Sequence, residues 1–195
     1  MQIFSGEKLG LDCGIDEAGR GAWAGPVVAA AVILPKNFLT KQINDSKKLS
    51  KNARNLLFNK ITLNSDFGIG YGSVTEIDNQ NILQATFFAM RRAVANLKSK
   101  PKRVLIDGNQ IPPDLPYVAQ SVVKGDTKVA SIAAASIIAK VTRDRLMKDL
   151  ARLYPGFGWD RNVGYGVKEH REALKTLGVT PEHRCSFKPI YNMLC

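Results

Sequence analysis

The chain has 195 residues, of which 45% are hydrophobic and 23% are charged, and its formal net charge is +11. This length suits one domain, and the composition excludes a disordered tail or a fibrous repeat. The longest stretch without a charge, Gly21 to Pro35, is shorter than the roughly 18 residues that a membrane-spanning helix requires. The N-terminus lacks the apolar segment of a secretory signal. We therefore expect a cytoplasmic protein without a membrane segment.

The positive charge is concentrated in two segments. Residues 41–60 carry a net charge of +5 and residues 91–103 a net charge of +6, so the rest of the chain is neutral overall. One such cluster is typical of a solvated helix face. Two clusters that hold all of the excess charge favour a polyanionic partner, because each neutralised phosphate releases condensed counterions. The charge pattern therefore favours nucleic acid as the partner.

The few cysteines and histidines exclude several kinds of site. Cys13, Cys185 and Cys195 are an odd number at wide spacing, which predicts no disulfide framework. His170 and His183 belong to no dense cluster of nitrogen and sulfur ligands, so we expect no structural zinc site. Any metal that acts here must have oxygen ligands.

Hydrophobic periodicity predicts the elements of the first third of the chain. Leu9–Ile15 and Pro26–Leu34 are expected to be two strands of a hairpin with a broad, glycine-rich connection. Ser50 is expected to cap a helix over Lys51–Leu63. Phe67–Val74 alternates apolar residues with glycine and serine, which indicates a strand that another backbone approaches closely.

Helices and strands alternate in the rest of the chain. Thr75 and Asp78 predict a capping box at the start of a long helix. The elements expected after it are strands over Arg103–Asp107 and Val118–Val123, a helix over Lys128–Leu153, a loop over Pro155–Gly166 and a helix over Lys168–Leu177. This order predicts an α/β fold whose mixed sheet has helices on its faces.

Four carboxylates lie at or beside the ends of predicted strands. Asp16 and Glu17 follow the first strand, Asp107 closes the fourth, and Asp126 precedes the long helix. Ligands bind at the carboxyl edge of an open α/β sheet, and acids gathered there repel one another unless a cation joins them. Mg²⁺ and Mn²⁺ suit carboxylate oxygens, and two such ions about 3.5–4 Å apart activate water and stabilise the leaving oxygen in phosphodiester cleavage.

Each acid also has a structural interpretation. Asp107 suits a turn before Gly108, and Asp126 suits the N-cap of the following helix. Taken singly, these interpretations outweigh catalysis. The adjacent pair Asp16 and Glu17 gains less from a structural role, because it lies among apolar residues and glycines. Spacing alone does not establish that the four acids meet.

Seven sequence blocks, in order, resemble the ribonuclease HII family. They cover nearly the whole chain and read G-I-D-E-A-G-R-G at 14–21, D-S-K-K-L at 45–49, L-I-D-G at 105–108, K-G-D at 124–126, A-S-I-A-A-A-S-I-I-A-K-V-T-R-D at 130–144, G-Y-G-V-K-E-H at 164–170 and H-R-x-S-F-x-P at 183–189. A lone glycine motif is weak, whereas seven ordered blocks are specific.

The resemblance implies a ribonuclease H-like fold, a mixed five-stranded sheet flanked by helices, with C-terminal helices. It implies one catalytic domain over residues 1–195, in which the part from about 155 onward is a helical extension that bears the tyrosine motif. The implied activity is hydrolysis of the RNA strand of RNA–DNA hybrids, and nicking 5′ of ribonucleotides embedded in duplex DNA, with 3′-hydroxyl and 5′-phosphate ends. The implied cofactor is Mg²⁺ or Mn²⁺, with two ions during catalysis.

The resemblance also assigns residues to roles. The catalytic, metal-binding acids are Asp16, Glu17, Asp107 and Asp126. The substrate-binding residues are Gly19, Arg20, Gly21, Tyr165, Lys47 and Lys48. The glycine element recognises the ribose 2′-hydroxyl through its backbone, because glycines permit close approach and that hydroxyl distinguishes RNA from DNA. The tyrosine packs on the following sugar, and the two lysines contact phosphate.

The sequence departs from the family motif at three positions. Val167 stands where many relatives have threonine, and Ala22 and Trp23 replace the commoner Pro-Leu. The chain ends without the diaromatic tail of a sliding-clamp binding peptide. We expect a monomer that binds RNA–DNA hybrid and ribonucleotide-containing duplex DNA, and we expect packing or hydrogen-bonding roles for His170 and His183.

Two other functions stay open on the sequence alone. A non-catalytic hybrid-binding module would keep its binding and its response to divalent ions after Asp107→Asn or Asp126→Asn. Another nuclease or resolvase of the same broad fold would be indifferent to replacement of the 2′-hydroxyl by hydrogen.

Overall fold

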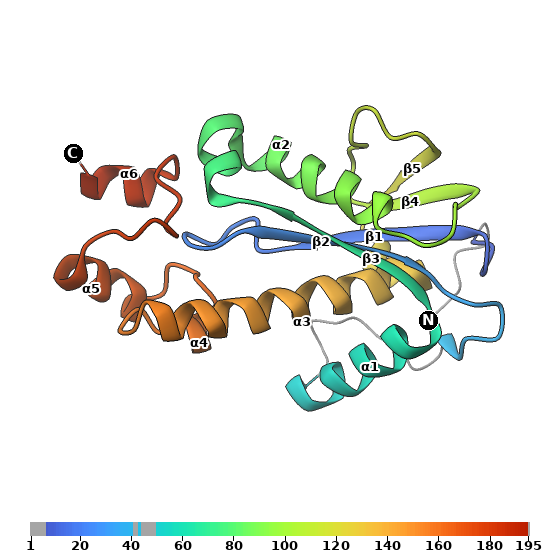
Figure 1. Cartoon of the computed structure of the whole chain (residues 1–195), viewed down its shortest axis with the longest axis horizontal. Coiled ribbons are helices and arrows are strands. Elements are labelled where there is room, and N and C mark those ends of the chain that lie inside the picture. The colour runs from blue at the N-terminus through green and yellow to red at the C-terminus, as the bar shows by residue number, and fades with distance from the viewer. Residues whose placement is uncertain (1–6, 41–42, 44–49, 195) are drawn as a thin grey trace.

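A mixed sheet forms the centre of the molecule (Figure 1). The computed structural model describes residues 7–40, 43 and 50–194. Its strands are β1 (Asp12–Ala18), β2 (Val27–Ile33), β3 (Asp66–Gly72), β4 (Arg103–Asp107) and β5 (Val118–Val122). They lie in the order β3-β2-β1-β4-β5, with β1, β2 and β3 antiparallel and β4 and β5 parallel to β1. This arrangement confirms the predicted fold class.

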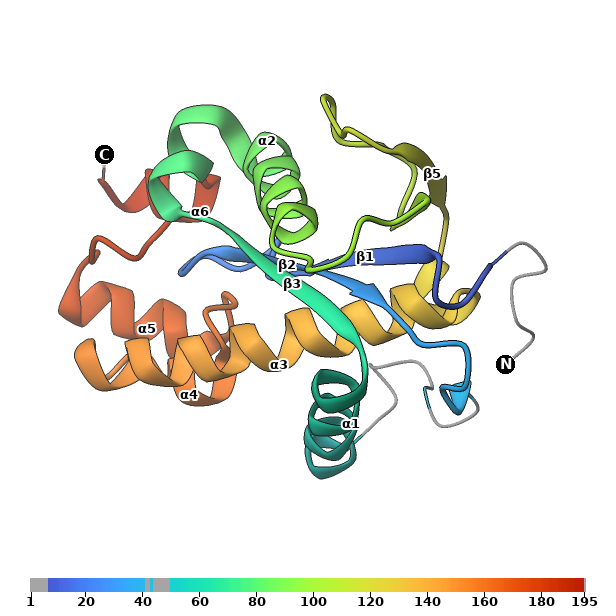
Figure 2. The ribbon, with the colours of Figure 1, turned by 45° about the vertical axis from the view of Figure 1, so that its right-hand side comes forward.

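Helices cover both faces of the sheet. They are α1 (Lys51–Asn64), α2 (Val74–Ala95), α3 (Ala130–Leu153), α4 (Trp159–Asn162), α5 (Lys168–Leu177) and α6 (Lys188–Leu194), with a short 3₁₀ helix η2 (Gly125–Thr127). Helix α2 lies on one face and α3 and α1 lie on the other, while α4, α5 and α6 gather at the end of the sheet where β1 turns into β2 (Figures 1 and 2). No helix in these described ranges is long and apolar enough to cross a membrane.

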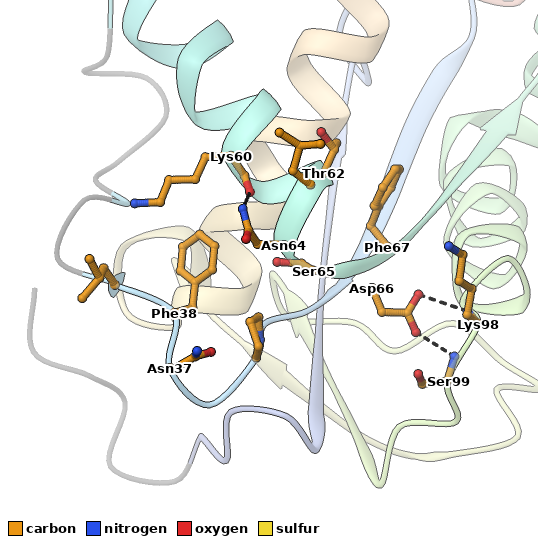
Figure 3. Close-up of a pocket in the computed structure, with 13 residues that line it drawn as sticks. Asn37, Phe38, Lys60, Thr62, Asn64, Ser65, Asp66, Phe67, Lys98 and Ser99 are labelled. Atoms are coloured by element: carbon orange, nitrogen blue, oxygen red, sulfur yellow. Dashed lines mark hydrogen bonds between the residues drawn. The ribbon is translucent and has the colours of Figure 1, made fainter.

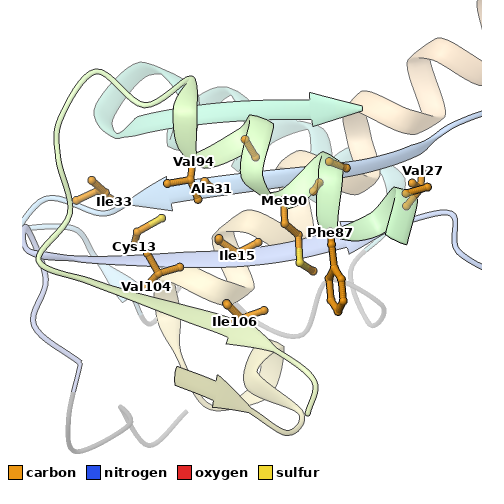
Figure 4. Close-up of a cluster of buried hydrophobic side chains, with 14 of the residues drawn as sticks. Cys13, Ile15, Val27, Ala31, Ile33, Phe87, Met90, Val94, Val104 and Ile106 are labelled. Atoms are coloured by element: carbon orange, nitrogen blue, oxygen red, sulfur yellow. The ribbon is translucent and has the colours of Figure 1, made fainter. Parts of the chain in front are cut away.

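Small residues let α2 approach the sheet closely. Strand β3 carries Gly68, Gly70 and Gly72 on one face, and a Cβ at any of them would overlap the backbone of α2 near an alanine. This contact confirms the close backbone approach that the alternating glycines predict. The core beneath α2 contains Cys13, which is fully buried (Figure 4). Burial raises the pKa of the Cys13 thiol to about 12, so this cysteine serves as a small apolar core residue.

The opposite face is built on close packing between α3 and β1. The first turns of α3 are rich in alanine, and a Cβ at Gly14 of β1 would overlap the α3 backbone at Ser131 and Ile132. The N–H groups of Ala130 and Ser131 donate to the carboxylate of Glu7, both at 2.9 Å. A carboxylate from the other end of the chain therefore satisfies the positive N-terminus of α3.

Two sequence-based expectations about strand ends and helix caps are wrong. Strand β1 runs on to Ala18, so Asp16 and Glu17 belong to the strand instead of following it. The capping box of α2 uses Ser73 and Glu76. Asp78 instead accepts hydrogen bonds from the backbone N–H groups of residues 185 and 186, which fasten the segment before α6. The predicted cap at Ser50 is confirmed.

The predicted loop over 155–166 contains the short helix α4. Its Trp159 is fully buried and packs with residues of α3, α5 and α6 in a separate apolar cluster. This cluster joins the C-terminal helices to the end of α3. The assignment of residues from about 155 onward to an extension of a single domain stays a prediction.

Candidate active site

The register of the sheet places two of the predicted acids side by side. Strands β1 and β4 are parallel neighbours, and Ile15 pairs with Ile106, so the next residues along the two strands are Asp16 and Asp107. Side chains alternate across a strand, which puts Asp16 on the same face as Gly14, the face that α3 covers. The prediction that separate strand ends bring acids together is confirmed for this pair.

A cavity of about 390 Å³ opens at this end of the sheet. Its acids are Asp16, Glu17 and Asp107, and its remaining lining residues are Ala18, Gly19, Arg20, Gly21, Arg54, Ser136, Lys140, Arg143 and Tyr165. The cavity therefore unites three of the four predicted acids, the whole predicted glycine element and the predicted tyrosine. Helix α3 contributes three of the polar lining residues that sequence reasoning did not assign, although they lie within the block at 130–144.

The carboxylates of Asp16 and Glu17 are held in an unfavourable environment. Burial raises the pKa of Asp16 well above its usual range, and the nearby charges of Glu17 and Asp107 raise it further. Burial also raises the pKa of Glu17, although Arg20, whose Nη1 lies 3.3 Å from Glu17 Oε1, opposes this shift. Glu17 Oε2 is buried and has no hydrogen-bond partner among the described residues. Arg20 therefore pairs with one oxygen of Glu17, and the second oxygen is left for a further positive partner.

The loop between β5 and α3 is tied to Asp107. The backbone N–H of Gly125 donates to Asp107 Oδ1 at 2.6 Å, and Lys124 just before it adopts a left-handed backbone with φ 56°. Asp126 follows in η2 and is buried. Asp126 therefore directly follows Gly125, the residue whose N–H binds Asp107. Asp126 itself does not line the cavity. It is not the N-cap of α3 either, because Val129 occupies that position.

The glycine element forms one wall of the cavity. Gly19 has φ +94°, and a Cβ there would overlap the guanidinium of Arg143. At Gly21, the nearest atom to an added Cβ is Tyr165 Cε1, at 3.7 Å. Tyr165 remains 40% exposed. The backbone of Gly21 and the ring of Tyr165 therefore lie next to each other at the edge of the cavity.

Two fully buried arginines support this wall from behind. Arg143 donates to the carbonyl oxygens of residues 24, 26 and 163 at 2.8–3.0 Å. Arg184 donates to the carbonyl oxygens of Gly25 and Arg20, both at 2.9 Å. Both guanidiniums bind backbone between β1 and β2, so they fix the course of the chain just after the glycine element. Burial, together with the charge of Arg143, lowers the pKa of Arg184 to about 9.

Other predicted features do not join the cavity. Lys47 and Lys48 lie outside the described residues. The basic segment 91–103 lies at the far end of β4, and its arginines pair with acids, namely Arg91 with Asp114, Arg92 with Glu76 and Arg103 with Asp12. A larger hollow of about 820 Å³ near the start of β3 is lined mainly by loop and α1 residues (Figure 3). Its carboxylate, Asp66, already accepts hydrogen bonds from the backbone of Lys98 and Ser99.

The acids suit a hard divalent cation by their chemistry. All of their donor atoms are carboxylate oxygens, which Mg²⁺ and Mn²⁺ prefer, and the unpartnered Glu17 Oε2 supplies one of them. Within residues 7–40, 43 and 50–194, however, no three His, Cys, Asp or Glu side chains are already grouped as a complete metal site. The carboxylate oxygens are therefore ligands of the kind that Mg²⁺ and Mn²⁺ prefer, although the described side chains are not arranged as a complete coordination shell.

The fold belongs to the ribonuclease H class. The chain superimposes on the crystal structure of ribonuclease H2 from Pyrococcus horikoshii with a TM-score of 0.76 and 28% identity, covering 93% of this chain and 96% of that one. A crystal structure of Bst-RNase HIII in complex with Mn²⁺ gives a TM-score of 0.74 at 19% identity, covering 95% of this chain and 70% of that one. The second likeness concerns the fold alone.

Sequence comparison narrows the class to one family. The family model Ribonuclease HII matches residues 13–190. The chain is 54% identical to a ribonuclease HII of Jannaschia sp. over 189 residues, which cover 97% of this chain and 95% of the relative. It is 55% identical to that of Paramagnetospirillum magneticum over 186 residues, which cover 93% and 92%. The chain belongs to the ribonuclease HII family, so it is a nuclease of a metal-dependent family that acts on RNA paired with DNA.

The Val167 departure has a structural consequence. Val167 is the N-cap residue of α5, where it provides no side-chain hydrogen bond to the first turn. We expect Val167→Thr to stabilise the protein by about 1 kcal/mol, because a threonine oxygen at this position accepts a hydrogen bond from the helix. Thermal unfolding measures this change as a rise in Tm of roughly 2–4 °C. Val167→Ser should behave alike, and Val167→Ala should not stabilise the protein.

Proposed function

We propose that the protein hydrolyses the RNA strand of RNA–DNA hybrids and nicks duplex DNA on the 5′ side of an embedded ribonucleotide, leaving 3′-hydroxyl and 5′-phosphate ends. The observation that carries this proposal is the cavity shared by Asp16, Glu17 and Asp107 with the glycine element and Tyr165. Acids suited to phosphodiester chemistry thus line the same cavity as a wall suited to a sugar. The protein is proposed to act as a cytoplasmic monomer.

The glycine wall and Tyr165 are proposed to select the ribonucleotide. Gly19 and Gly21 carry no side chains of their own, and the space beside Gly21 is open to 3.7 Å, so a ribose 2′-hydroxyl can reach the polar groups of this backbone. The exposed ring of Tyr165 provides an apolar face for the next sugar along the strand. Arg143 and Arg184 keep this backbone in place, which orients the scissile phosphate toward the acids.

The acids are proposed to hold Mg²⁺ or Mn²⁺, with Asp16, Glu17 and Asp107 as ligands and Asp126 joining from the adjacent η2. Bound divalent ions supply a water nucleophile of lowered pKa and stabilise charge on the leaving oxygen. The chain contributes the positions of its oxygens. Arg20 restrains Glu17, and the N–H of Gly125 fixes Asp107. Lys140 and Arg54 add positive charge to the same cavity for the phosphate.

A basic groove continues from the cavity between α1 and α3. It is lined by Lys51, Arg54, Asn55, Val141, Asp144, Arg145 and Lys148. Arg54 lines both this groove and the cavity. We propose that the groove carries the phosphates of the substrate duplex away from the cleavage point, with Lys51 and Arg54 as its contribution from the basic 41–60 segment.

We expect Lys148→Ala to weaken duplex binding equally for substrates with and without a ribonucleotide, because phosphate contacts carry no sugar information. The slope of log affinity against log salt concentration should fall in magnitude by about 0.9, the contribution of one phosphate contact. Fluorescence anisotropy at several salt concentrations measures it. Lys102→Ala, an exposed lysine at the far end of β4, serves as the matched control and should leave the slope unchanged.

The proposed function is tested with three duplexes that differ at one position. One contains a single ribonucleotide, the second contains the matching deoxyribonucleotide, and the third contains a 2′-O-methyl ribonucleotide. With Mg²⁺, we expect one nick on the 5′ side of the ribonucleotide and no cleavage of the other two. Cleavage of the all-DNA duplex, or a cut that leaves a 2′,3′-cyclic phosphate, would refute the proposal. Without divalent ions, no duplex should be cut.

A further inference from the structure

Two buried histidines lie behind the Tyr165 loop, and the proposed mechanism does not use them. His170 on α5 is 0% exposed and His183, before α6, is 1% exposed. Their Nε2 atoms lie 3.0 Å apart. Aromatic rings of Phe157 and Trp159 surround the pair. These are the two histidines of the whole chain, so any histidine signal from the protein comes from this pair.

The hydrogen bonds around the pair permit one arrangement of the ring protons. The backbone N–H of Thr180 donates to His183 Nδ1 at 2.9 Å, so neutral His183 carries its proton on Nε2 and donates it to His170 Nε2. Trp159 Nε1 also donates to His170 Nε2, at 3.1 Å. His170 therefore carries its proton on Nδ1, which lies 3.1 Å from the carbonyl oxygen of Tyr165.

A further proton is disfavoured in this arrangement. On His183 Nδ1 it would face the donating Thr180 N–H, although Thr180 Oγ1, 2.9 Å away, could accept it. On His170 Nε2 it would face two donors. Burial, together with the neighbouring His170, lowers the pKa of His183 to about 4. Burial also lowers the pKa of His170. Both rings are neutral at pH 7, and all hydrogen bonds point from Thr180 toward Tyr165.

This chain of hydrogen bonds ends on the backbone that presents the tyrosine ring. The Tyr165 carbonyl accepts from His170 and from the N–H of Val167 at 2.8 Å. Val163, two residues earlier, has φ 46°, a strained conformation for a β-branched residue that persists only where surrounding contacts hold it. The ring of Tyr165 itself stays exposed beside Gly21. The backbone at Tyr165 is thus held by hydrogen bonds, while its side chain stays open to a ligand in the cavity.

We propose that His170 and His183 are positioning residues for substrate recognition: as a neutral pair with one fixed direction of hydrogen bonding, they hold the Tyr165 backbone so that its ring packs on the sugar at the cavity. This inference rests on the proposed function, because the sugar is the proposed partner of Tyr165. It assigns the histidines no proton transfer.

Two substitutions at His183 separate the hydrogen bond from ring packing. His183→Phe keeps an aromatic ring and removes the donor to His170, whereas His183→Gln keeps an N–H near the position of Nε2. We expect His183→Phe to lower kcat/KM for the single-ribonucleotide duplex by about 10–100-fold, mainly through KM, as a displaced substrate-positioning group does. His183→Gln should recover most of that loss. Glu172→Gln, an exposed change on α5, is the matched control without effect.

The decisive comparison repeats both substitutions in the Tyr165→Ala background. Because the histidines act through Tyr165, the His183→Phe penalty on kcat/KM should disappear there. The same penalty in both backgrounds would overturn the inference, as would a His183→Gln variant as defective as His183→Phe. Failure of the proposed function would look different, since the wild-type protein would then leave the ribonucleotide duplex intact.

Nitrogen-15 NMR of the wild-type histidines tests the arrangement without activity or a variant. At pH 7 we expect one ring protonated on Nδ1, assigned to His170, and one on Nε2, assigned to His183. Two rings of the same tautomer, or a doubly protonated ring, would overturn the proposal.

Discussion

Asp16→Asn should abolish cleavage and at the same time make the metal-free protein more stable. The charged carboxylate of Asp16 is buried beside Glu17 and Asp107, which raises its pKa, so its ionised form at neutral pH destabilises the fold. An amide of the same shape removes that cost. We expect stabilisation by roughly 1–2 kcal/mol, in the range of changes that relieve a strained functional site, and a rise in Tm of roughly 2–8 °C. Cleavage should fall by about 10³-fold or more.

The difference in stability between Asp16→Asn and wild type should depend on pH, because the pKa of Asp16 is raised in the folded protein. A carboxyl group with a raised pKa in the folded state costs no stability below its unfolded pKa; the cost grows as pH rises from the unfolded pKa to the folded pKa and stays constant above it. The Tm advantage of Asp16→Asn should therefore be largest at neutral pH and vanish toward pH 4. Excess Mg²⁺ should stabilise the wild type and leave the variant unchanged, because a ligand stabilises only the state that binds it. A variant that is less stable than wild type at pH 7 without metal would contradict this account.

Gly21→Ala should impair recognition of the ribonucleotide without affecting the fold. An added Cβ at Gly21 meets its nearest neighbour, Tyr165 Cε1, at an ordinary contact distance of 3.7 Å, so thermal stability should stay near that of wild type. The methyl group nevertheless occupies the space into which the sugar must enter. We expect kcat/KM for the single-ribonucleotide duplex to fall about 10–100-fold.

Gly19→Ala should lower both the thermal stability and the kcat/KM for the single-ribonucleotide duplex. The test is the contrast with Gly21→Ala, which should lower kcat/KM alone. Gly19 combines φ +94° with an overlap between a Cβ and Arg143, so we expect a loss of about 1–3 kcal/mol of stability together with activity. Gly178→Ala is the matched control, because Gly178 also has positive φ (75°) but has nothing within 4 Å of an added Cβ. Gly178→Ala should lower stability only through the strain of an alanine at positive φ, and it should leave kcat/KM unchanged. Equal activity of Gly21→Ala and wild type would argue against a sugar-sensing wall.

The sequence predicted the architecture well where local patterns determine it. The alternating glycines of β3 predict the close approach of another backbone, and α2 packs against them in the structure. The predicted cap of α2, Thr75, lies two residues beyond the observed cap, Ser73. Both residue types are acceptable caps, and only tertiary contacts give Asp78 its other partners. The carboxylate that caps α3, Glu7, lies 123 residues from its partner in sequence, so no local pattern reveals it.

Much of the candidate site was accessible from the sequence, but its supporting residues were not. Strand ends and family motifs identified Asp16, Glu17, Asp107 and Tyr165, which the cavity brings together. Arg143 and Arg184 bind backbone carbonyl oxygens instead of acids, and such contacts leave no charge pattern in a sequence. The hydrogen bond between the two histidines likewise depends on how α5 meets the segment before α6.

The central claim is that carboxylates from neighbouring strands hold divalent ions beside the glycine wall. The most direct measurement is anomalous diffraction from crystals of the Asp126→Asn variant soaked with Mn²⁺ and a single-ribonucleotide duplex. We predict manganese between the oxygens of Asp16, Glu17 and Asp107, with the ribose against Gly19–Gly21. Manganese bound elsewhere while these carboxylates stay empty, with the ribose away from the glycines, would contradict the account.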